Sequence, residues 1–315
     1  MPQTKTAALA DKLQKSIGRV IVGKQQQVEL VLTAMFAGGH VLLEDVPGTG
    51  KTTLAKSLAK SLQCSFSRIQ FTPDLLPADI TGMRIYDQHS GEFQFLPGPV
   101  FTGILLADEI NRATPRTQSA LLECMSERQV TEGGITYRLE DPFLVIATQN
   151  PVETQGTFAL PEAQLDRFFI KLSVGYPTRE ESIAMLQRFF DNEPLAELTA
   201  VATAEDVREA AAECAKCRVD KDIMDYMVQL CEAARNPAAV RLGPSPRALL
   251  TLMRCCQALA CIRDRDFVIP DDVKELAVPV LAHRLILRGN QYRSNPEQFL
   301  AELTNQVPVP TENAL

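Results

Sequence analysis

Short apolar runs alternate with amphipathic segments along the chain up to about residue 175. This alternation is typical of parallel strands whose two faces are covered by helices. The pattern predicts strands at Val41–Glu44, Ser67–Phe71, Ile104–Ala107, Phe143–Thr148 and Phe168–Leu172. It predicts helices at Lys24–Ala37, Lys51–Leu62, Thr114–Ser126 and near Pro161–Arg167. We therefore expect an α/β core with a five-stranded parallel sheet.

Two segments interrupt this pattern, and a third region replaces it. Met83–Leu96 and Gln129–Leu139 alternate in polarity around glycine-containing turns, which predicts two β-hairpins. Beyond residue 176 the pattern indicates helices only, at Arg179–Asp191, Ala204–Cys217, Lys221–Ala234, Ser245–Asp264 and Asp271–Leu287. The expected division is a core at residues 1–176, a small all-α domain at residues 177–304 and a loose C-terminal tail at residues 305–315.

The composition is that of a globular protein, because 45% of the 315 residues are hydrophobic and 23% are charged. The polar N-terminus and the interrupted apolar stretches predict no signal peptide and no membrane span, so we expect a cytoplasmic protein. The net charge of −7 argues against nucleic acid as the partner. Cys214 and Cys217 form a C-x-x-C without the second pair that a zinc site needs, which favours free thiols.

The segment after the first predicted strand carries the most informative chemistry. It reads Asp-Val-Pro-Gly-Thr-Gly-Lys-Thr-Thr at residues 45–53, at the start of a predicted helix. Gly48 and Gly50 let backbone N–H groups approach a phosphate, Lys51 reaches the outer oxygens, and the Thr52 hydroxyl can hold Mg²⁺. The segment predicts a nucleoside triphosphate site built by Pro47, Gly48, Thr49, Gly50, Lys51, Thr52 and Thr53.

One residue departs from the phosphate-loop pattern. The G-x-x-x-x-G-K-[ST] form has glycine where this chain has Asp45. A chance Gly-Lys-Thr in an ordinary turn is the alternative, and the strand-loop-helix context disfavours it.

Polar residues follow two of the later strands. Asp108 and Glu109 come directly after the third strand, and the carboxyl ends of parallel strands meet at one edge of a sheet. Asp108 would share the Mg²⁺ with Thr52, and Glu109 would polarise a water for attack on the terminal phosphate. Asn150, after the fourth strand, is a candidate to orient that water, although Asn before proline is also a plain turn signal.

In combination these motifs resemble the AAA+ ATPases, and most closely the MoxR family. The resemblance extends from about residue 15 to residue 290 and is carried by residues 45–52, 106–113, 117–131, 147–151, 160–168 and 243–248. It implies a P-loop AAA+ core with hairpin insertions, followed by a helical lid. It also implies ATP and Mg²⁺ as cofactors and a ring of identical subunits, expected to be a hexamer.

The resemblance assigns roles to residues outside the phosphate loop. Val22 and Gly23 match the segment that packs on adenine, although an apolar N-terminal helix start would look similar. Arg167 matches the arginine that one subunit supplies to the nucleotide of its neighbour. An ion pair of Arg167 with Glu162 or Asp166 is the structural alternative.

A second sensor is expected in the lid. Arg247 matches an arginine that reaches the phosphates of its own subunit, and nearby Arg241 is an alternative for the same role.

The family resemblance implies that ATP hydrolysis drives chaperone-like remodelling or maturation of client proteins, together with a partner that carries a von Willebrand A domain. A motor on nucleic acid and a nucleotide-gated scaffold with little turnover are the alternatives. Phe93 and Phe95 of the first hairpin are candidates to contact a client, unless they pack on the sheet.

Overall fold

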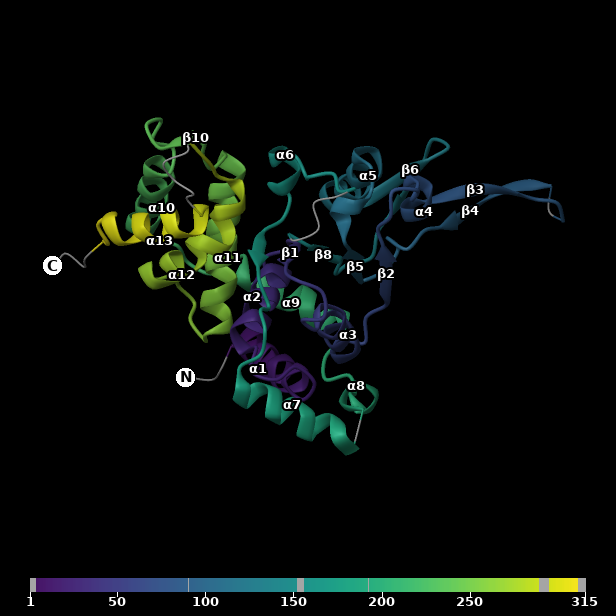
Figure 1. Cartoon of the computed structure of the whole chain (residues 1–315), viewed down its shortest axis with the longest axis horizontal. Coiled ribbons are helices and arrows are strands. Elements are labelled where there is room, and N and C mark those ends of the chain that lie inside the picture. Colours follow the sequence, from purple (N-terminus) through teal and green to yellow (C-terminus); the bar gives the residue numbers. More distant parts are fainter. Residues whose placement is uncertain (1–3, 90, 152–155, 192, 289–294, 311–315) are drawn as a thin grey trace.

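The computed structural model describes residues 4–89, 91–151, 156–191, 193–288 and 295–310. A central sheet lies between a projecting hairpin at one end of the molecule and a helical bundle at the other (Figure 1). No helix in these ranges is long and apolar enough to cross a membrane. Positions 311–315 of the expected tail lie outside the described residues.

Five parallel strands form the sheet in the order β2-β5-β8-β1-β9, which confirms the predicted fold class. They are β1 (Val41–Glu44), β2 (Phe66–Gln70), β5 (Ile104–Asp108), β8 (Leu144–Gln149) and β9 (Ile170–Leu172). Each strand lies within two residues of its predicted range. The register pairs Gln70 with Asp108 and Glu44 with Gln149, so the carboxyl ends of four strands meet at one edge.

Helices cover both faces of the sheet because successive strand residues point to opposite sides. Leu43 and Leu106 belong to a hydrophobic cluster on one face, and Leu42 and Leu105 belong to a cluster on the other. The first face is covered by α1 (Lys5–Gly18), α2 (Gln25–Phe36) and α3 (Lys51–Ser61), and the second by α4 (Pro77–Thr81) and α5 (Pro115–Glu127). This double burial explains why β1, β5 and β8 appear in the sequence as continuous apolar runs.

Both predicted hairpins are present, apart from Ser90, which lies outside the described residues. Strand β3 (Gly82–Asp87) pairs with β4 (Glu92–Pro97), and β6 (Gln129–Glu132) pairs with β7 (Ile135–Arg138). The ring of Phe95 stacks on Tyr137 with centroids 4.0 Å apart, which joins the two hairpins, whereas Phe93 is 59% exposed. Phe95 therefore packs, and Phe93 lies at the surface.

The rest of the described chain is mainly helical. It contains α6 (Glu162–Leu165), α7 (Arg179–Asp191), α8 (Pro194–Glu197), α9 (Ala204–Cys214), α10 (Lys221–Ala233), α11 (Pro246–Ile262), α12 (Pro270–Leu281) and α13 (Pro296–Gln306). The expectation of helices only is wrong in one place, because β10 (Val240–Leu242) and β11 (Ile286–Leu287) form an antiparallel pair. The helix predicted to reach Leu287 accordingly ends at Leu281, and the 3-10 turn η2 (Ala282–Arg284) follows it.

The helical bundle packs directly on the α/β core. One hydrophobic cluster runs from Leu43 of the sheet through Leu32 of α2 to Leu252 of α11 and Leu276 of α12, and all four side chains are fully buried. Because this cluster crosses residues 176 and 177, the proposed boundary between two domains stays a prediction.

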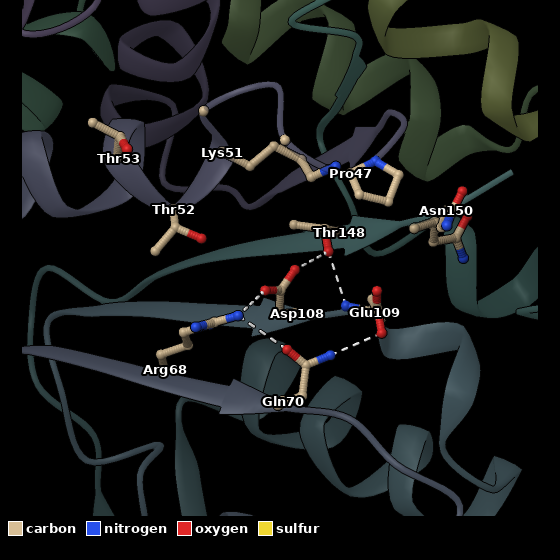
Figure 2. Close-up of a pocket in the computed structure, with 13 residues that line it drawn as sticks. Pro47, Lys51, Thr52, Thr53, Arg68, Gln70, Asp108, Glu109, Thr148 and Asn150 are labelled. Atoms are coloured by element: carbon tan, nitrogen blue, oxygen red, sulfur yellow. Dashed lines mark hydrogen bonds and ion pairs between the residues drawn. The ribbon is translucent and has the colours of Figure 1, made fainter. Parts of the chain in front are cut away.

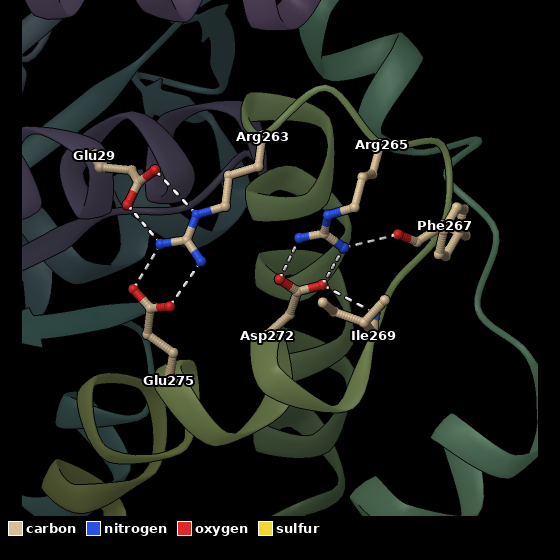
Figure 3. A network of polar contacts seen from close by, with 7 residues as sticks. All are labelled: Glu29, Arg263, Arg265, Phe267, Ile269, Asp272 and Glu275. Atoms are coloured by element: carbon tan, nitrogen blue, oxygen red, sulfur yellow. Dashed lines mark hydrogen bonds and ion pairs between the residues drawn. The ribbon is translucent and has the colours of Figure 1, made fainter. Parts of the chain in front are cut away.

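Two arginines after the C-terminal end of α11 reinforce this packing (Figure 3). Arg263 lies between Glu29 of α2 and Glu275 of α12, at 2.9 and 2.7 Å, and hydrogen bonds to Glu275 and Glu29 raise the pKa of its guanidinium. Arg265 contacts the fully buried carboxylate of Asp272 at 2.6 Å. A planar guanidinium shared between the carboxylates of two helices fixes how those helices lie against each other.

Candidate nucleotide site

A cavity of about 400 Å³ lies at the carboxyl edge of the sheet, beside the loop that follows β1 (Figure 2). Its lining residues are Pro47, Gly48, Gly50, Lys51, Thr52, Thr53, Arg68, Gln70, Asp108, Glu109, Thr148, Gln149 and Asn150. The structure therefore brings together most of the predicted phosphate-loop residues, both predicted carboxylates and Asn150. The side chains of Arg68, Gln70, Thr148 and Gln149 were not expected there.

The loop has the geometry of a phosphate cradle. Gly48 and Gly50 have φ angles of 85° and 87°, in the left-handed region that favours glycine. The Nζ of Lys51 donates to the carbonyl oxygens of Asp45 and Val46 at 3.0 and 2.8 Å, which holds the ammonium group over the loop. Helix α3 begins at Lys51, so its unpaired N–H groups and the positive end of its dipole lie at the cavity. An anion of the size of a polyphosphate suits this arrangement.

The departure from glycine at Asp45 has a structural reason. The Asp45 side chain is buried and accepts hydrogen bonds from Ser173 Oγ at 2.7 Å, Val174 N at 2.5 Å and Gly175 N at 3.1 Å. These donors follow β9, so the carboxylate joins the phosphate loop to the segment that leads into α7. Glycine at position 45 would leave these donors without this acceptor.

One hydroxyl of the neighbouring strand β8 contacts both predicted acidic residues, at the carboxylate of Asp108 and at the backbone of Glu109. Asp108 ends β5, and Glu109 follows with a φ of 56°, which is uncommon for a residue with a side chain. Thr148 Oγ1 donates to Asp108 Oδ1 at 2.6 Å and accepts a hydrogen bond from Glu109 N at 2.8 Å. Thr148 thus stabilises the turn that directs both carboxylates to the cavity.

Two residues of β2 contact these carboxylates (Figure 2). Arg68 Nη2 lies 2.6 Å from Asp108 Oδ2, and Gln70 Nε2 donates to Glu109 Oε2 at 2.8 Å. Arg112, in the 3-10 turn η1 (Ile110–Arg112), also donates to Glu109 Oε2, at 3.0 Å. The sequence did carry a signal for Arg68 and Gln70, because polar residues alternate around Ile69 at the carboxyl end of a strand.

The donor set fits Mg²⁺. The hydroxyl of Thr52 and the carboxylate of Asp108 both line the cavity, and hard oxygen ligands of this kind suit Mg²⁺ together with phosphate and water. Arg68 contacts one oxygen of Asp108, so a cation there would compete with this guanidinium.

A second cavity, of about 180 Å³, adjoins the first at Gly48, Gly50 and Thr53. Most of its lining is apolar and includes Val20, Ile21, Val22, Leu54, Val174, Pro177, Met185 and Phe189. Thr49 lines it as well, and Lys24 and Glu181 close it with an ion pair at 3.4 Å. Gly23 lies against Glu181, whose Oε1 is 2.0 Å from the position that a Cβ would take. A flat apolar group such as a nucleobase suits this cavity.

Arg167 lies outside both cavities. It follows α6, is half-buried, and donates through Nη1 to the Leu122 carbonyl at 2.7 Å and to Ser126 Oγ, both on α5. The ion pair considered as an alternative for Arg167 involves a different arginine, because Asp166 pairs with Arg284.

Arg247 also lies outside both cavities. It is exposed at the second position of α11, and Ser245, which caps that helix, donates to Asp166 Oδ2 at 3.2 Å. Helix α11 packs on α2, and the expectation that Arg247 reaches the phosphates of its own subunit stays a prediction. Arg241, on β10, is exposed and lines neither cavity.

Known proteins are similar to this chain in sequence and in fold. A family model described as ATPase family associated with various cellular activities (AAA) matches residues 40–170, and a model of the AAA lid domain matches residues 232–304. The chain is 46% identical to the uncharacterized protein YeaC of Bacillus subtilis, over 97% of this chain and 96% of YeaC. It is 43% identical to the chaperone MoxR1 of Mycobacterium tuberculosis, over 95% of this chain and 82% of MoxR1. The chain belongs to the MoxR family of AAA ATPases.

A solved structure supports the same assignment for this MoxR-family protein. A crystal structure of a protein from Cytophaga hutchinsonii superposes with a TM-score of 0.89 at 39% identity, covering 98% of this chain and 97% of that one. The protein is therefore an ATPase that binds nucleotide on an AAA fold. The roles of its individual residues follow from the geometry above and are proposals.

Proposed function

We propose that this MoxR-family ATPase works as a ring of identical subunits, expected to be a hexamer, and uses Mg²⁺-dependent ATP hydrolysis to remodel or mature client proteins. The observation that supports the proposal most is the meeting of Lys51, Thr52, Asp108 and Glu109 in one cavity at the edge of the sheet. Few reactions other than phosphoryl transfer need a phosphate cradle, two oxygen ligands for a metal and a carboxylate base together in one cavity.

Within one subunit, the loop and α3 bind the phosphates, and the apolar cavity beside Val22 and Gly23 holds the base. Thr52 and Asp108 would hold Mg²⁺, which neutralises charge on the phosphates when it is bound. Glu109 orients and deprotonates the attacking water, with Asn150 near it. Because Gln70 and Arg112 both donate to Glu109 Oε2, they restrain the carboxylate on one side and leave Oε1 for the water.

Between subunits, Arg167 supplies positive charge to the nucleotide of the neighbour, whereas Arg247 is expected to reach the phosphates of its own subunit. Arg167 lines neither cavity of its own subunit, and this placement supports a role toward the neighbour. An arginine that arrives from a neighbour accelerates phosphoryl transfer by about 10³ to 10⁵. A separate subunit is therefore expected to hydrolyse ATP slowly.

The client role rests on relatives and on one exposed surface. A relative at 43% identity is named a chaperone. The first hairpin exposes Tyr86, Phe93 and Leu96 by 56%, 59% and 53%, and such side chains suit transient contact with a protein client. A partner with a von Willebrand A domain, which the family resemblance implies, and a cytoplasmic location, which the polar N-terminus and the interrupted apolar stretches predict, complete the proposal.

Substitution of Glu109 by Gln tests the catalytic part. Glu109→Gln keeps the size and the hydrogen-bond acceptor but removes the base, so hydrolysis is expected to fall by about 10² to 10⁴ while ATP stays bound. Release of phosphate, retained nucleotide and ring mass are measured on the assembled protein with ATP and Mg²⁺. Equal, negligible rates in the parent and in Glu109→Gln would instead identify a scaffold that is gated by nucleotide.

Substitution of Lys51 by Ala tests the binding part. Lys51→Ala removes the ammonium group over the loop, and ATP affinity is expected to fall by at least about tenfold because a charge-assisted contact is lost. Fluorescent-nucleotide titration measures it, with Lys56→Ala on the same helix as the control. Parental affinity in Lys51→Ala would show that the phosphates bind elsewhere.

A further inference from the structure

A buried arginine lies far along the chain from the phosphate loop and contacts the segment that carries Arg167. Arg284, in η2, is 4% exposed. Its Nε lies 3.0 Å from Asp166 Oδ1, and its Nη2 donates to the carbonyl oxygens of Phe168 at 2.7 Å and of Asp166 at 3.2 Å. The neighbouring His283 shares the Phe168 carbonyl through Nε2 at 3.0 Å. The guanidinium thus binds the backbone on both sides of Arg167.

Asp166 also joins this segment to α11. Its carboxylate accepts from Ser245 Oγ, and the same oxygen of Ser245 accepts a hydrogen bond from Ala248 N at 3.1 Å. The capping residue of α11 is therefore fixed to the residue before Arg167. Arg247 lies two positions beyond this cap, so one carboxylate contacts the chain close to both arginines.

The energetics do not favour this arrangement as a device for stability alone. Arg284 is buried and the Asp166 side chain is 20% exposed, so the pair loses much of its hydration. Apolar side chains of similar volume are often at least as stabilising in such places. The Nε and Nη1 of Arg284 have no hydrogen-bond partner among the described residues, although Nε forms an ion pair with Asp166. These N–H groups without a hydrogen bond add to the cost of burying the guanidinium. The pair does restrict the orientation of the chain around residues 166–168. A guanidinium that contacts one carboxylate and two carbonyl oxygens allows few arrangements of these groups.

We propose that Arg284 and Asp166 are positioning residues that hold Arg167 and the start of α11 as one unit toward the nucleotide of the neighbouring subunit. The inference rests on the proposed function, because it requires Arg167 to act across a subunit boundary. Arg284 and Asp166 touch neither nucleotide nor water in this role and act only through the residues that they hold.

Two conservative variants test it. Arg284→Lys keeps the positive charge but loses the planar set of N–H donors, and Asp166→Asn keeps the shape but loses the negative charge. In each, kcat is expected to fall by about 10²-fold, since a displacement of about 1 Å in a catalytic group costs that much. The affinity for ATP is expected to stay within about twofold of the parent, because the cradle of the same subunit is intact.

The hydrolysis rate of mixed rings distinguishes a positioning role from a merely structural one. Each variant is co-expressed with Lys51→Ala, whose cradle is defective but whose Arg167, Asp166 and Arg284 are intact, and rings that contain both are purified through two tags. The rate per intact cradle is expected to rise at least about tenfold over the variant alone, because the neighbour then supplies a correctly held arginine. Arg167→Ala mixed with Lys51→Ala is the reference for catalysis between subunits.

The outcomes separate the inference from the proposed function. Rescue of Arg167→Ala without rescue of Arg284→Lys and Asp166→Asn, or parental kcat in both variants alone, would overturn the positioning role and leave the proposed function standing. Absence of rescue for Arg167→Ala itself would overturn catalysis between subunits, and the positioning role with it. Arg265→Lys is the matched control, because it weakens another pair of the helical bundle, between a partly buried arginine and the buried Asp272, that does not contact residues 166–168. It is expected to lower the melting temperature without lowering kcat.

Discussion

Glu109 is held by contacts that come from three separate places in the chain. Thr148 fixes its backbone, while Gln70 and Arg112 donate to one oxygen of its carboxylate. A base held in this way keeps one rotamer in the absence of substrate, so less ordering is needed when ATP arrives.

Gln70→Ala tests this restraint. Loss of the donor lets the Glu109 carboxylate adopt other rotamers, so kcat is expected to fall by about tenfold while ATP affinity is unchanged. Steady-state hydrolysis and nucleotide titration measure the two quantities. Ser67→Ala, on the other face of β2, is the control, and a variant of Gln70 with parental kcat would contradict the restraint.

At the residue scale, the sequence predicted the site residues that belong to short continuous patterns. The phosphate-loop residues are consecutive, and Asp108 and Glu109 follow an apolar strand, so both are visible as short patterns. Arg68 and Gln70 belong to a different strand, and their relevance appears only when β2 is placed next to β5. The placement of Arg247 depends on how α11 packs, which no short pattern contains.

At the scale of elements, burial explains both the successes and the failures. Strands β1, β5 and β8 were predicted closely because their apolar side chains are buried on both faces. Helix α1 was missed because its buried face includes the small residues Ala7, Ala10 and Ser16, and Ser16 contacts Ser61 of α3 through hydroxyls 2.8 Å apart. The run Leu285-Ile286-Leu287 fits a helix or a strand equally well by periodicity. Part of it, Ile286–Leu287, forms a strand because it pairs with β10.

Asp45→Gly tests the link between the phosphate loop and the segment before α7. The substitution restores the usual motif, yet it is expected to weaken ATP binding by about tenfold and to lower stability by about 1–3 kcal/mol, because Val174 N and Gly175 N lose their acceptor. Nucleotide titration and urea unfolding measure the two effects.

Asp45→Asn keeps one oxygen acceptor and is the graded control for this test. It is expected to fall between the parent and Asp45→Gly in both measurements. ATP affinity in Asp45→Gly equal to that of the parent would contradict the link.

At the scale of the whole molecule, two buried histidines make stability depend on pH. His40 accepts a hydrogen bond from Val145 N at Nδ1 at 3.0 Å, so its Nε2 donates to the Met125 carbonyl at 3.2 Å and the ring is neutral. Burial lowers the pKa of His40 to about 4 and lowers the pKa of His283 well below its usual value.

The sign follows from the lowered pKa. Both histidines favour the folded state fully above pH 6.5, the ordinary value, and this contribution is lost as the pH falls from 6.5 toward 4, because the unfolded chain takes up the protons first. His40 alone is expected to remove about 3 kcal/mol of unfolding free energy over that range. Urea unfolding across the range measures it, and His40→Gln, although less stable, is expected to show a shallower decline. An identical decline in the two proteins would exclude His40 as the cause.

The hydrophobic cluster that passes from the sheet through α2 into α11 and α12 has a consequence for engineering. The segment that matches the AAA lid domain looks exchangeable between relatives by sequence, since it is continuous from residue 232 to residue 304. Its inner surface is nevertheless shaped against Leu32 and its neighbours on α2. A chimera that joins this segment to the sheet of a relative therefore replaces only one side of this packing interface. Helix α2 has to be transferred together with the segment.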